Sequence, residues 1–149
     1  MQIEDEIKGR FRNEHHKAVI NLIFTSNYVN HRFVEFLKTH GLSSQQYNIL
    51  RVLRGFGPQA RSVDFLRERM LDKSSDISRI VERLYQKKLV ERSESKTDRR
   101  RKDIKITQKG LYLLDEMYSC EKKVDNLLSV LSLEETVQLN QILDKIRSR

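Results

Sequence analysis

The chain has 149 residues, enough for one ordinary domain with a buried core. Hydrophobic residues make up 38% of it and charged residues 34%, while one proline and five glycines argue against a disordered chain and against a turn-rich all-β fold. The net charge of +8 favours polyanionic partners.

The cysteine content and the hydropathy of the chain bear on where it works. Cys120 is the only cysteine, which excludes a disulfide within the chain and is typical of the cytoplasm. No apolar run approaches the ~18 residues of a membrane-spanning helix. The first ten residues lack the apolar segment of a signal peptide. We therefore expect a cytoplasmic protein.

The first 13 residues are polar and charged, which predicts a loose arm or a frayed helical turn. A long amphipathic helix follows over residues 14–40, because apolar residues recur there at spacings of three and four. These residues are Val19, Leu22, Ile23, Val29, Phe33, Phe36 and Leu37.

A second helix is predicted directly after the first. Gly41 is suited to end the long helix, because glycine adopts a left-handed backbone at low cost. Ser43 and Gln46 then fit a capping box, in which the two side chains satisfy free N–H groups at a helix start. The helix that they open ends near Gly55.

A helix-turn-helix is predicted between Ser62 and Leu84. Ser62 is placed to cap one short helix, and Asp72 or Ser74 to open another that runs to Leu84. Two short helices joined by three or four residues are typical of this motif.

The pattern then changes from helix to strand. Residues 89–93 and 103–107 alternate partly between apolar and polar, which predicts two short strands. The connecting residues, 94–102, include no apolar residue, so we expect them to project from the protein as a wing. Between Arg79 and Lys105 there are eleven basic and five acidic residues, a concentrated charge that indicates a nucleic-acid interface.

Two helices complete the chain. Thr107 is placed to cap a second long helix that runs to Leu131, and Ser132 begins a terminal helix with a second capping box. The fold class is therefore mainly α with a small β-hairpin, a winged helix-turn-helix with long flanking dimerisation helices. Those flanking helices carry more apolar positions than a small winged helix can cover, which predicts a core shared between two subunits.

This organisation predicts a single domain over residues 1–149. Residues 14–40 and 108–149 are expected to form the dimerisation helices, and residues 43–107 the DNA-binding lobe.

Two segments resemble the MarR (multiple-antibiotic-resistance regulator) family. Residues 72–84 are similar to its recognition helix. Its wing pattern is Asp-x-Arg, then a strand that ends in an apolar residue, Thr, two variable residues and Gly. Asp98, Arg100, Ile106, Thr107 and Gly110 match this pattern in order and spacing.

The resemblance covers roughly residues 18–146 and implies a homodimeric, mostly bacterial, double-stranded DNA-binding transcriptional regulator. It implies a repressor on a pseudo-palindromic operator, relieved by a small-molecule effector. Two departures from the family stand out. Lys88 replaces the glycine that often ends the recognition helix, and Arg67 replaces a small residue in the preceding helix. If the left-handed conformation persists at Lys88, lysine costs roughly 1 kcal/mol there against glycine. Arg67 either points outward, toward a phosphate for example, or the local packing differs from that of the family.

Base contacts are expected from the start of the recognition helix, which fits the major groove. Arg79 is the candidate for a bidentate contact with guanine, and Arg83 for a phosphate. Asp76 either accepts from cytosine or only favours the helix start. The full set of DNA-binding candidates in this helix is Ser74, Ser75, Asp76, Ser78, Arg79 and Arg83.

The wing is expected to line the minor groove. Arg100 is the candidate for insertion, because a narrow groove concentrates negative potential, and Asp98 is expected to orient its basic neighbours. The DNA-binding candidates in the wing are Lys96, Asp98, Arg99, Arg100, Arg101 and Lys102.

Four residues are candidates for a ligand pocket, because they lie where the family places its effector cleft. Asn27, Asn30, His31 and Tyr47 line such a pocket or serve as hydrogen-bonding groups at the subunit interface. Cys120 is either a structural thiol or, beside two lysines, a redox sensor.

Metal binding and catalysis are not indicated by the sequence. The four histidines lack companions at metal-ligand spacing, so we expect no metal and no cofactor. No nucleophile with a base and no glycine-rich phosphate loop is present, so we expect no catalytic residues and no enzyme. The alternative function is a winged-helix adaptor that binds protein without specific DNA binding.

Overall fold

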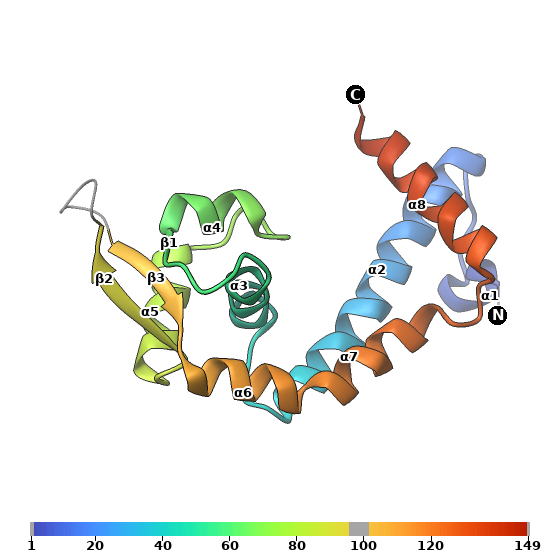
Figure 1. Ribbon diagram of the computed structural model, residues 1–149. Helices are drawn as coiled ribbons and strands as arrows, with labels where there is room; N and C mark the ends of the chain where they lie inside the picture. Colours follow the sequence, from blue (N-terminus) through green and yellow to red (C-terminus); the bar gives the residue numbers. More distant parts are fainter. Residues whose placement is uncertain (1, 96–101, 149) are drawn as a thin grey trace.

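The computed structural model describes residues 2–95 and 102–148, except for the side chain of Cys120. The molecule has a compact lobe and an elongated helical arm (Figure 1). The helices of the lobe are α3 (Ser44–Gly55), α4 (Val63–Arg69), α5 (Ile77–Gln86) and α6 (Gln108–Glu116). Its strands are β1 (Arg61–Ser62), β2 (Val90–Glu94) and β3 (Lys102–Ile106). The arm contains α1 (Ile3–Ile7), α2 (Glu14–Lys38), α7 (Tyr118–Asp125), a 3₁₀ turn (Asn126–Leu128) and α8 (Leu133–Arg147).

The helix-start signals of the sequence are confirmed. The side chain of Ser43 accepts from the backbone N–H of Gln46 at 3.2 Å, and the Gln46 side chain accepts in return from the Ser43 N–H, also at 3.2 Å. Ser62, Thr107 and Ser132 each cap the helix that follows them. These caps satisfy N–H groups that would otherwise lack a partner, so the helix starts are set locally.

The lobe has one apolar core. Its centre is built from fully buried side chains of α3, α4, α5, β2, β3 and α6, together with Leu37 at the end of α2 and Met117 at the end of α6. The three strands form an antiparallel sheet in the order β1-β3-β2, with Ile104 of the middle strand opposite Arg61 on one side and Arg92 on the other. The core therefore fixes α5 and the base of the wing on the same body.

Several sequence-based boundaries were wrong. The first 13 residues are not simply a loose arm: α1 buries Ile3, and Glu4 lies 2.5 Å from Lys17 of α2. The pair of predicted strands is displaced by about one residue, and β1 was missed because a two-residue strand has no periodicity. The second long helix is interrupted at Met117 and again by the 3₁₀ turn. Its apolar spacing continues through these interruptions, so periodicity alone did not show them.

The α5 helix ends in a Schellman motif with Lys88 in the left-handed position. The N–H of Leu89 bonds to the Leu84 carbonyl at 3.0 Å, and the N–H of Lys88 bonds to the Tyr85 carbonyl at 2.9 Å. Lys88 has φ 61°, and Gly41 occupies the same place after α2 with φ 66°. The conformation that glycine favours therefore persists at Lys88, which is the condition under which lysine is expected to cost stability there.

Replacing Lys88 with glycine should raise the free energy of unfolding by up to about 1 kcal/mol, because the left-handed strain of a side chain with Cβ is removed. Urea denaturation of the two proteins measures this difference. Gln86→Gly is the matched control. Gln86 is the last residue of α5, so glycine there should lower stability. A K88G protein less stable than the wild type would contradict the argument.

The joint between the wing and α6 explains the Thr-x-x-Gly pattern. The Thr107 hydroxyl accepts from the Gly110 N–H at 3.1 Å and donates to the Lys88 carbonyl at 2.8 Å. The Thr107 N–H bonds to the Leu89 carbonyl at 3.0 Å. A Cβ on Gly110 would lie 2.5 Å from that same carbonyl oxygen. Gly110 therefore lets α6 lie against the end of the recognition helix.

Candidate nucleic-acid interface

The α5 helix presents one apolar and one polar face. Ile77, Val81 and Leu84 are buried in the lobe, whereas Ser78, Arg79 and Arg83 are exposed. This division follows from helical spacing, because residues three and four apart share a face. The polar face is thus held outward by the burial of the apolar one.

The helix α5 begins later than the predicted opening at Asp72 or Ser74. Asp76 is its N-cap, and the Asp76 carboxylate accepts from the backbone N–H of Arg79 at 3.2 Å. Of the two roles considered for Asp76, the structure shows the one at the helix start. Ser74 and the half-buried Ser75 lie in the turn before the helix.

The turn before α5 is ordered by Asp72. Its carboxylate accepts from the backbone N–H of Ser74 at 2.9 Å and from the Ser74 hydroxyl at 2.6 Å. The Ser74 hydroxyl bond, with the backbone bond second, lowers the pKa of Asp72 below its usual value. Ser74 is therefore already engaged within the protein, although its hydroxyl oxygen can still accept a hydrogen bond.

Arg79 and Arg83 make no ion pair with any residue that the structure describes. The acid between them in sequence, Glu82, pairs instead with Arg92 of β2 at 2.6 Å and accepts from Gln86 at 3.2 Å. Arg92 also stacks on Tyr85, 4.0 Å from the ring centre. Glu82, the acid on the same helix, therefore does not neutralise the two arginines.

Two shallow cavities flank this face of α5. One, of about 280 Å³, is lined by residues of the α3 start and of α5, among them Gln45, Arg79 and Arg83. The other, of about 330 Å³, includes Ser78 and Lys102 in its lining. The start of the recognition helix and the base of the wing therefore open onto the same region.

Most of the wing candidates fall outside the described residues. These are Lys96, Asp98, Arg99, Arg100 and Arg101. Lys102 is described: it begins β3, is exposed, and its ammonium lies 3.6 Å from Glu94 on the paired strand. Arg67, the departure in α4, points outward and pairs with Asp64 of its own helix.

The four candidates for a ligand pocket do not form one site. Tyr47 lines a cavity of about 290 Å³ between α2, α3 and α7, whereas Asn30 lines another, of about 650 Å³, between α2 and the turn before α5. Asn27 and His31 line neither of these two cavities, and His31 lies 3.7 Å from Glu35. The structure of one chain therefore does not bring the four candidates together: Tyr47 lies on α3, and of the three candidates on α2 only Asn30 lines one of these two cavities.

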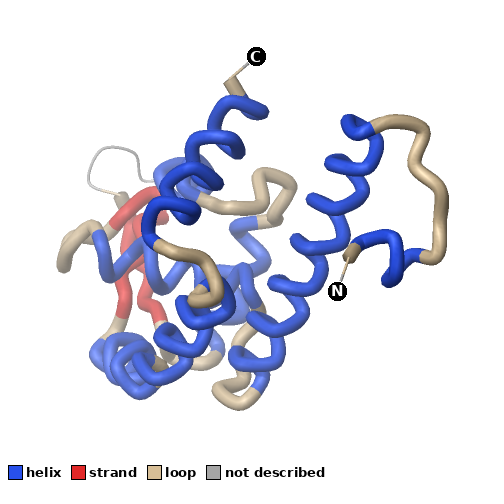
Figure 2. The backbone as a smooth tube through the Cα atoms, turned by 90° about the vertical axis from the view of Figure 1, so that its right-hand side faces the viewer, coloured by secondary structure: helices blue, strands red, loops and turns tan. Residues whose placement is uncertain are grey.

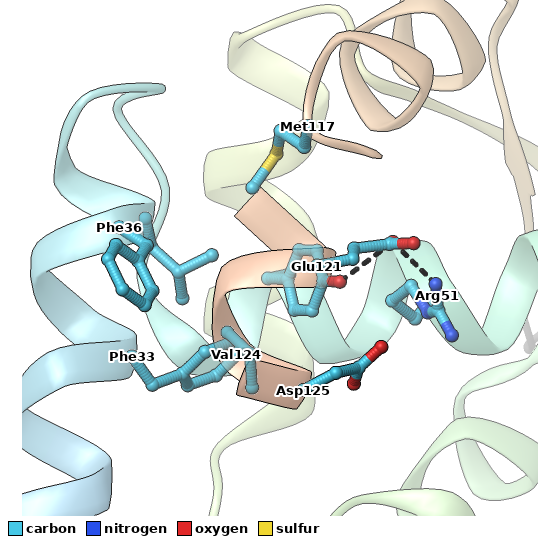
Figure 3. Close-up of a pocket in the computed structure, with 9 residues that line it drawn as sticks. Phe33, Phe36, Arg51, Met117, Glu121, Val124 and Asp125 are labelled. Atoms are coloured by element: carbon cyan, nitrogen blue, oxygen red, sulfur yellow. Dashed lines mark hydrogen bonds and ion pairs between the residues drawn. The ribbon is translucent and has the colours of Figure 1, made fainter. Parts of the chain in front are cut away.

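The Tyr47 cavity has an apolar side and a charged side (Figure 3). Phe33, Phe36 and Val124 lie on one side, and Arg51 and Glu121 point toward each other on the other. Sequence reasoning missed Arg51 and Glu121. Arg51 follows Tyr47 by four residues, a spacing that was available as a signal, but Glu121 is 70 residues farther along.

Three side chains of α3 meet the same oxygen of Glu121. The Tyr47 hydroxyl donates to Oε1 at 2.9 Å, Arg51 at 2.5 Å and Arg54 at 3.3 Å. Burial raises the pKa of Tyr47 to about 12, and the bond to the Glu121 carboxylate adds to the shift. We call Tyr47, Arg51, Arg54 and Glu121 the Glu121 cluster.

The phenol of Tyr47 is expected to ionise near pH 12 rather than near 10. Because its pKa is raised in the folded state, its contribution to stability is complete below pH 10 and is lost as the pH rises toward 12. The difference in phenolate absorbance between the wild type and Tyr47→Phe isolates this group. Glu121→Gln should lower the midpoint. A difference curve centred near pH 10 would contradict the burial argument.

Other classes of site have little support in the described part of the chain. No group of three or more His, Cys, Asp and Glu residues there is arranged to hold a metal ion. Within the same residues, no helix is both long and apolar enough to span a membrane.

Comparison with known proteins identifies the family. A MarR family profile matches residues 40–101. The transcriptional regulator MhqR of Bacillus subtilis (strain 168) is 30% identical over 119 residues, which are 79% of this chain and 81% of MhqR.

Solved structures agree on the fold. The organohalide-sensing regulator RdhR, bound to 2,4-dichlorophenol, has a TM-score of 0.80 at 20% identity, over 93% of this chain and 85% of RdhR. The S. aureus MepR–DNA complex has a TM-score of 0.76 at 23% identity, over 89% of this chain and 96% of that one. As the wing and recognition-helix patterns predicted, this chain belongs to the MarR family of winged helix-turn-helix transcriptional regulators.

Proposed function

We propose that the chain is a homodimeric repressor that binds a pseudo-palindromic operator through α5 and the wing. The observation that carries this proposal is the exposed face of α5, where Arg79 and Arg83 have no acidic partner among the described residues. An α-helix fits the major groove, and arginine pairs with guanine bidentately. The relative MepR forms a complex with DNA.

The dimer would be formed by residues 14–40 and 108–149. Large apolar side chains are exposed on α2 and α8, namely Val19, Leu22, Ile23, Phe24, Tyr28, Leu133, Val137, Ile142 and Ile146. Figure 2 shows α8 standing apart from α2, so the two helices do not cover each other. Exposed apolar surface of this extent supports association with a second copy.

The wing is proposed to add affinity, with Arg100 in the minor groove and Arg99, Arg101 and Lys102 near phosphates. Lys96 would join these phosphate contacts, and Asp98 would orient them. Ser74 and Ser75 in the turn before α5, together with Ser78, would add hydrogen bonds around Arg79. If the dimer neutralises ~6–8 phosphates, the slope of log affinity against log salt should be about −5 to −7.

A binding selection from genomic DNA with the purified protein tests the proposal. The expected result is an enriched inverted repeat that binds at least about 10³-fold more tightly than scrambled duplex at the same salt concentration. Light scattering should give the mass of two chains, and the enriched repeat should block transcription in vitro when occupied. Equal affinity for scrambled duplex would instead favour the adaptor function.

We further propose that a small molecule relieves repression by binding the Tyr47 cavity. Its volume of about 290 Å³ and its apolar side suit a small aromatic compound, and the relative RdhR binds 2,4-dichlorophenol. That compound is a suitable probe: it should raise the melting temperature and release DNA. Val124→Phe, which narrows the cavity from the α7 side, should abolish the rise in melting temperature. An unchanged response in this variant would place the ligand elsewhere.

Such a regulator would act in the cytoplasm, without a metal or cofactor and without catalysis. The named relative MhqR is a transcriptional regulator, which supports this part of the proposal.

A further inference from the structure

The Glu121 cluster connects the lobe to the arm. Tyr47, Arg51 and Arg54 are spaced by four and three residues, so they share one face of α3. All three donate to Oε1 of Glu121, which lies on α7 and has a side chain only 19% exposed. One carboxylate thus holds three groups of the lobe, and two of them are charged.

The cluster spans the interruption of the helix at Met117. Glu121 lies after it, on α7, and Asp115 lies before it, on α6. Arg54 reaches both acids, at 3.3 Å from Glu121 and 3.5 Å from Asp115. The same face of α3 therefore contacts α6 before the interruption at Met117 and α7 after it.

The rest of α7 packs on α2 rather than into the core of the lobe. On α6, Leu114 and Gly110 are buried, whereas none of the described side chains of α7 is buried. The cavity of about 290 Å³ lies between α2, α3 and α7. Packed interiors resist deformation, whereas a space of this kind leaves room for α7 to tilt. The charged contact is thus the restraint that links α7 directly to α3, beside the packing of α7 on α2.

We infer that Glu121 is a positioning residue that sets the angle between the DNA-binding lobe and α7, and with it the half-site spacing that the dimer prefers. The inference rests on the proposed dimeric DNA binding. Half-sites of such dimers lie about 34 Å apart, and one base pair adds about 3.4 Å. A small tilt at α7, repeated in both subunits, is therefore enough to change the preferred spacing.

The test compares Glu121→Gln with the wild type on the repeat found by the selection and on versions with one base pair added or removed at its centre. The wild type should prefer one spacing by about tenfold or more. E121Q keeps the shape of the side chain but not its charge, so its affinities for the three spacings should fall within about threefold of one another. Its affinity for a single half-site should be unchanged.

The control is Glu116→Gln, which makes the same change of charge. Glu116 is exposed near the end of α6 and makes no hydrogen bond or ion pair within the described residues. It should retain the wild-type preference. Tyr47→Phe, which removes one of the three donors, should weaken the preference less than E121Q.

Several outcomes would overturn the inference. One is an E121Q protein that keeps the wild-type spacing preference; another is equal weakening on all three spacings and on the half-site, which indicates a purely structural role. If E121Q does not fold, Glu121→Asp, which keeps the charge on a shorter side chain, replaces it and should shift or broaden the preferred spacing. An unchanged preference in E121D would then refute the inference. If the wild type shows no preference for the repeat over scrambled duplex, the proposed function fails instead.

Discussion

Replacing Gly110 with alanine is expected to destabilise the protein by about 2–4 kcal/mol. The added Cβ would lie 2.5 Å from the Leu89 carbonyl oxygen and 2.7 Å from a side-chain carbon of Ile106. The carbonyl belongs to backbone that is already bonded to the Thr107 N–H, so it cannot rotate away. The helix α6 must therefore move away from the end of α5. This cost outweighs the helix propensity of alanine, which exceeds that of glycine by about 1 kcal/mol.

Urea unfolding of this variant, beside Gly55→Ala, measures the effect. Gly55 is the last residue of α3, and no atom lies within 4 Å of the position of its Cβ. The same substitution there should be neutral or slightly stabilising. Equal stability of the two variants would show that the close approach at Gly110 does not determine the packing of α6.

Replacing Arg79 with alanine is expected to reduce the affinity for the operator by about 1–3 kcal/mol per half-site and to relax the preference for the base pair that it contacts. Arg79 is exposed near the start of α5 without an acidic partner in the described chain, so its guanidinium is available to DNA. Competition binding against operators that differ at one position in each half-site measures both quantities.

Arg83→Ala separates base reading from phosphate contact. Because Arg83 lies one turn farther along α5, its loss should weaken binding evenly across sequences and reduce the magnitude of the salt slope by about 1 per subunit. Arg147→Ala, which removes the same charge from α8, controls for net charge. If the Arg79 variant weakened all sequences equally, the proposed assignment of base contact to this residue would be wrong.

Sequence alone determined the features that depend on neighbouring residues. Ser43, Ser62, Thr107 and Ser132 were each identified as helix caps, because a cap bonds to N–H groups within three residues of itself. Helical spacing likewise indicated which face of α5 is buried.

Tertiary structure decided the rest. The start of α5 at Asp76 was not resolved by local signals, because Asp72, Ser74 and Asp76 are all suitable caps and the first two bond to each other. Only packing selects among caps of similar strength. The Glu121 cluster joins residues about 70 positions apart, and no pattern within one helix predicts such a contact. It exists because the chain bends at Met117 and brings α7 beside α3, a direction that the buried core of the lobe imposes.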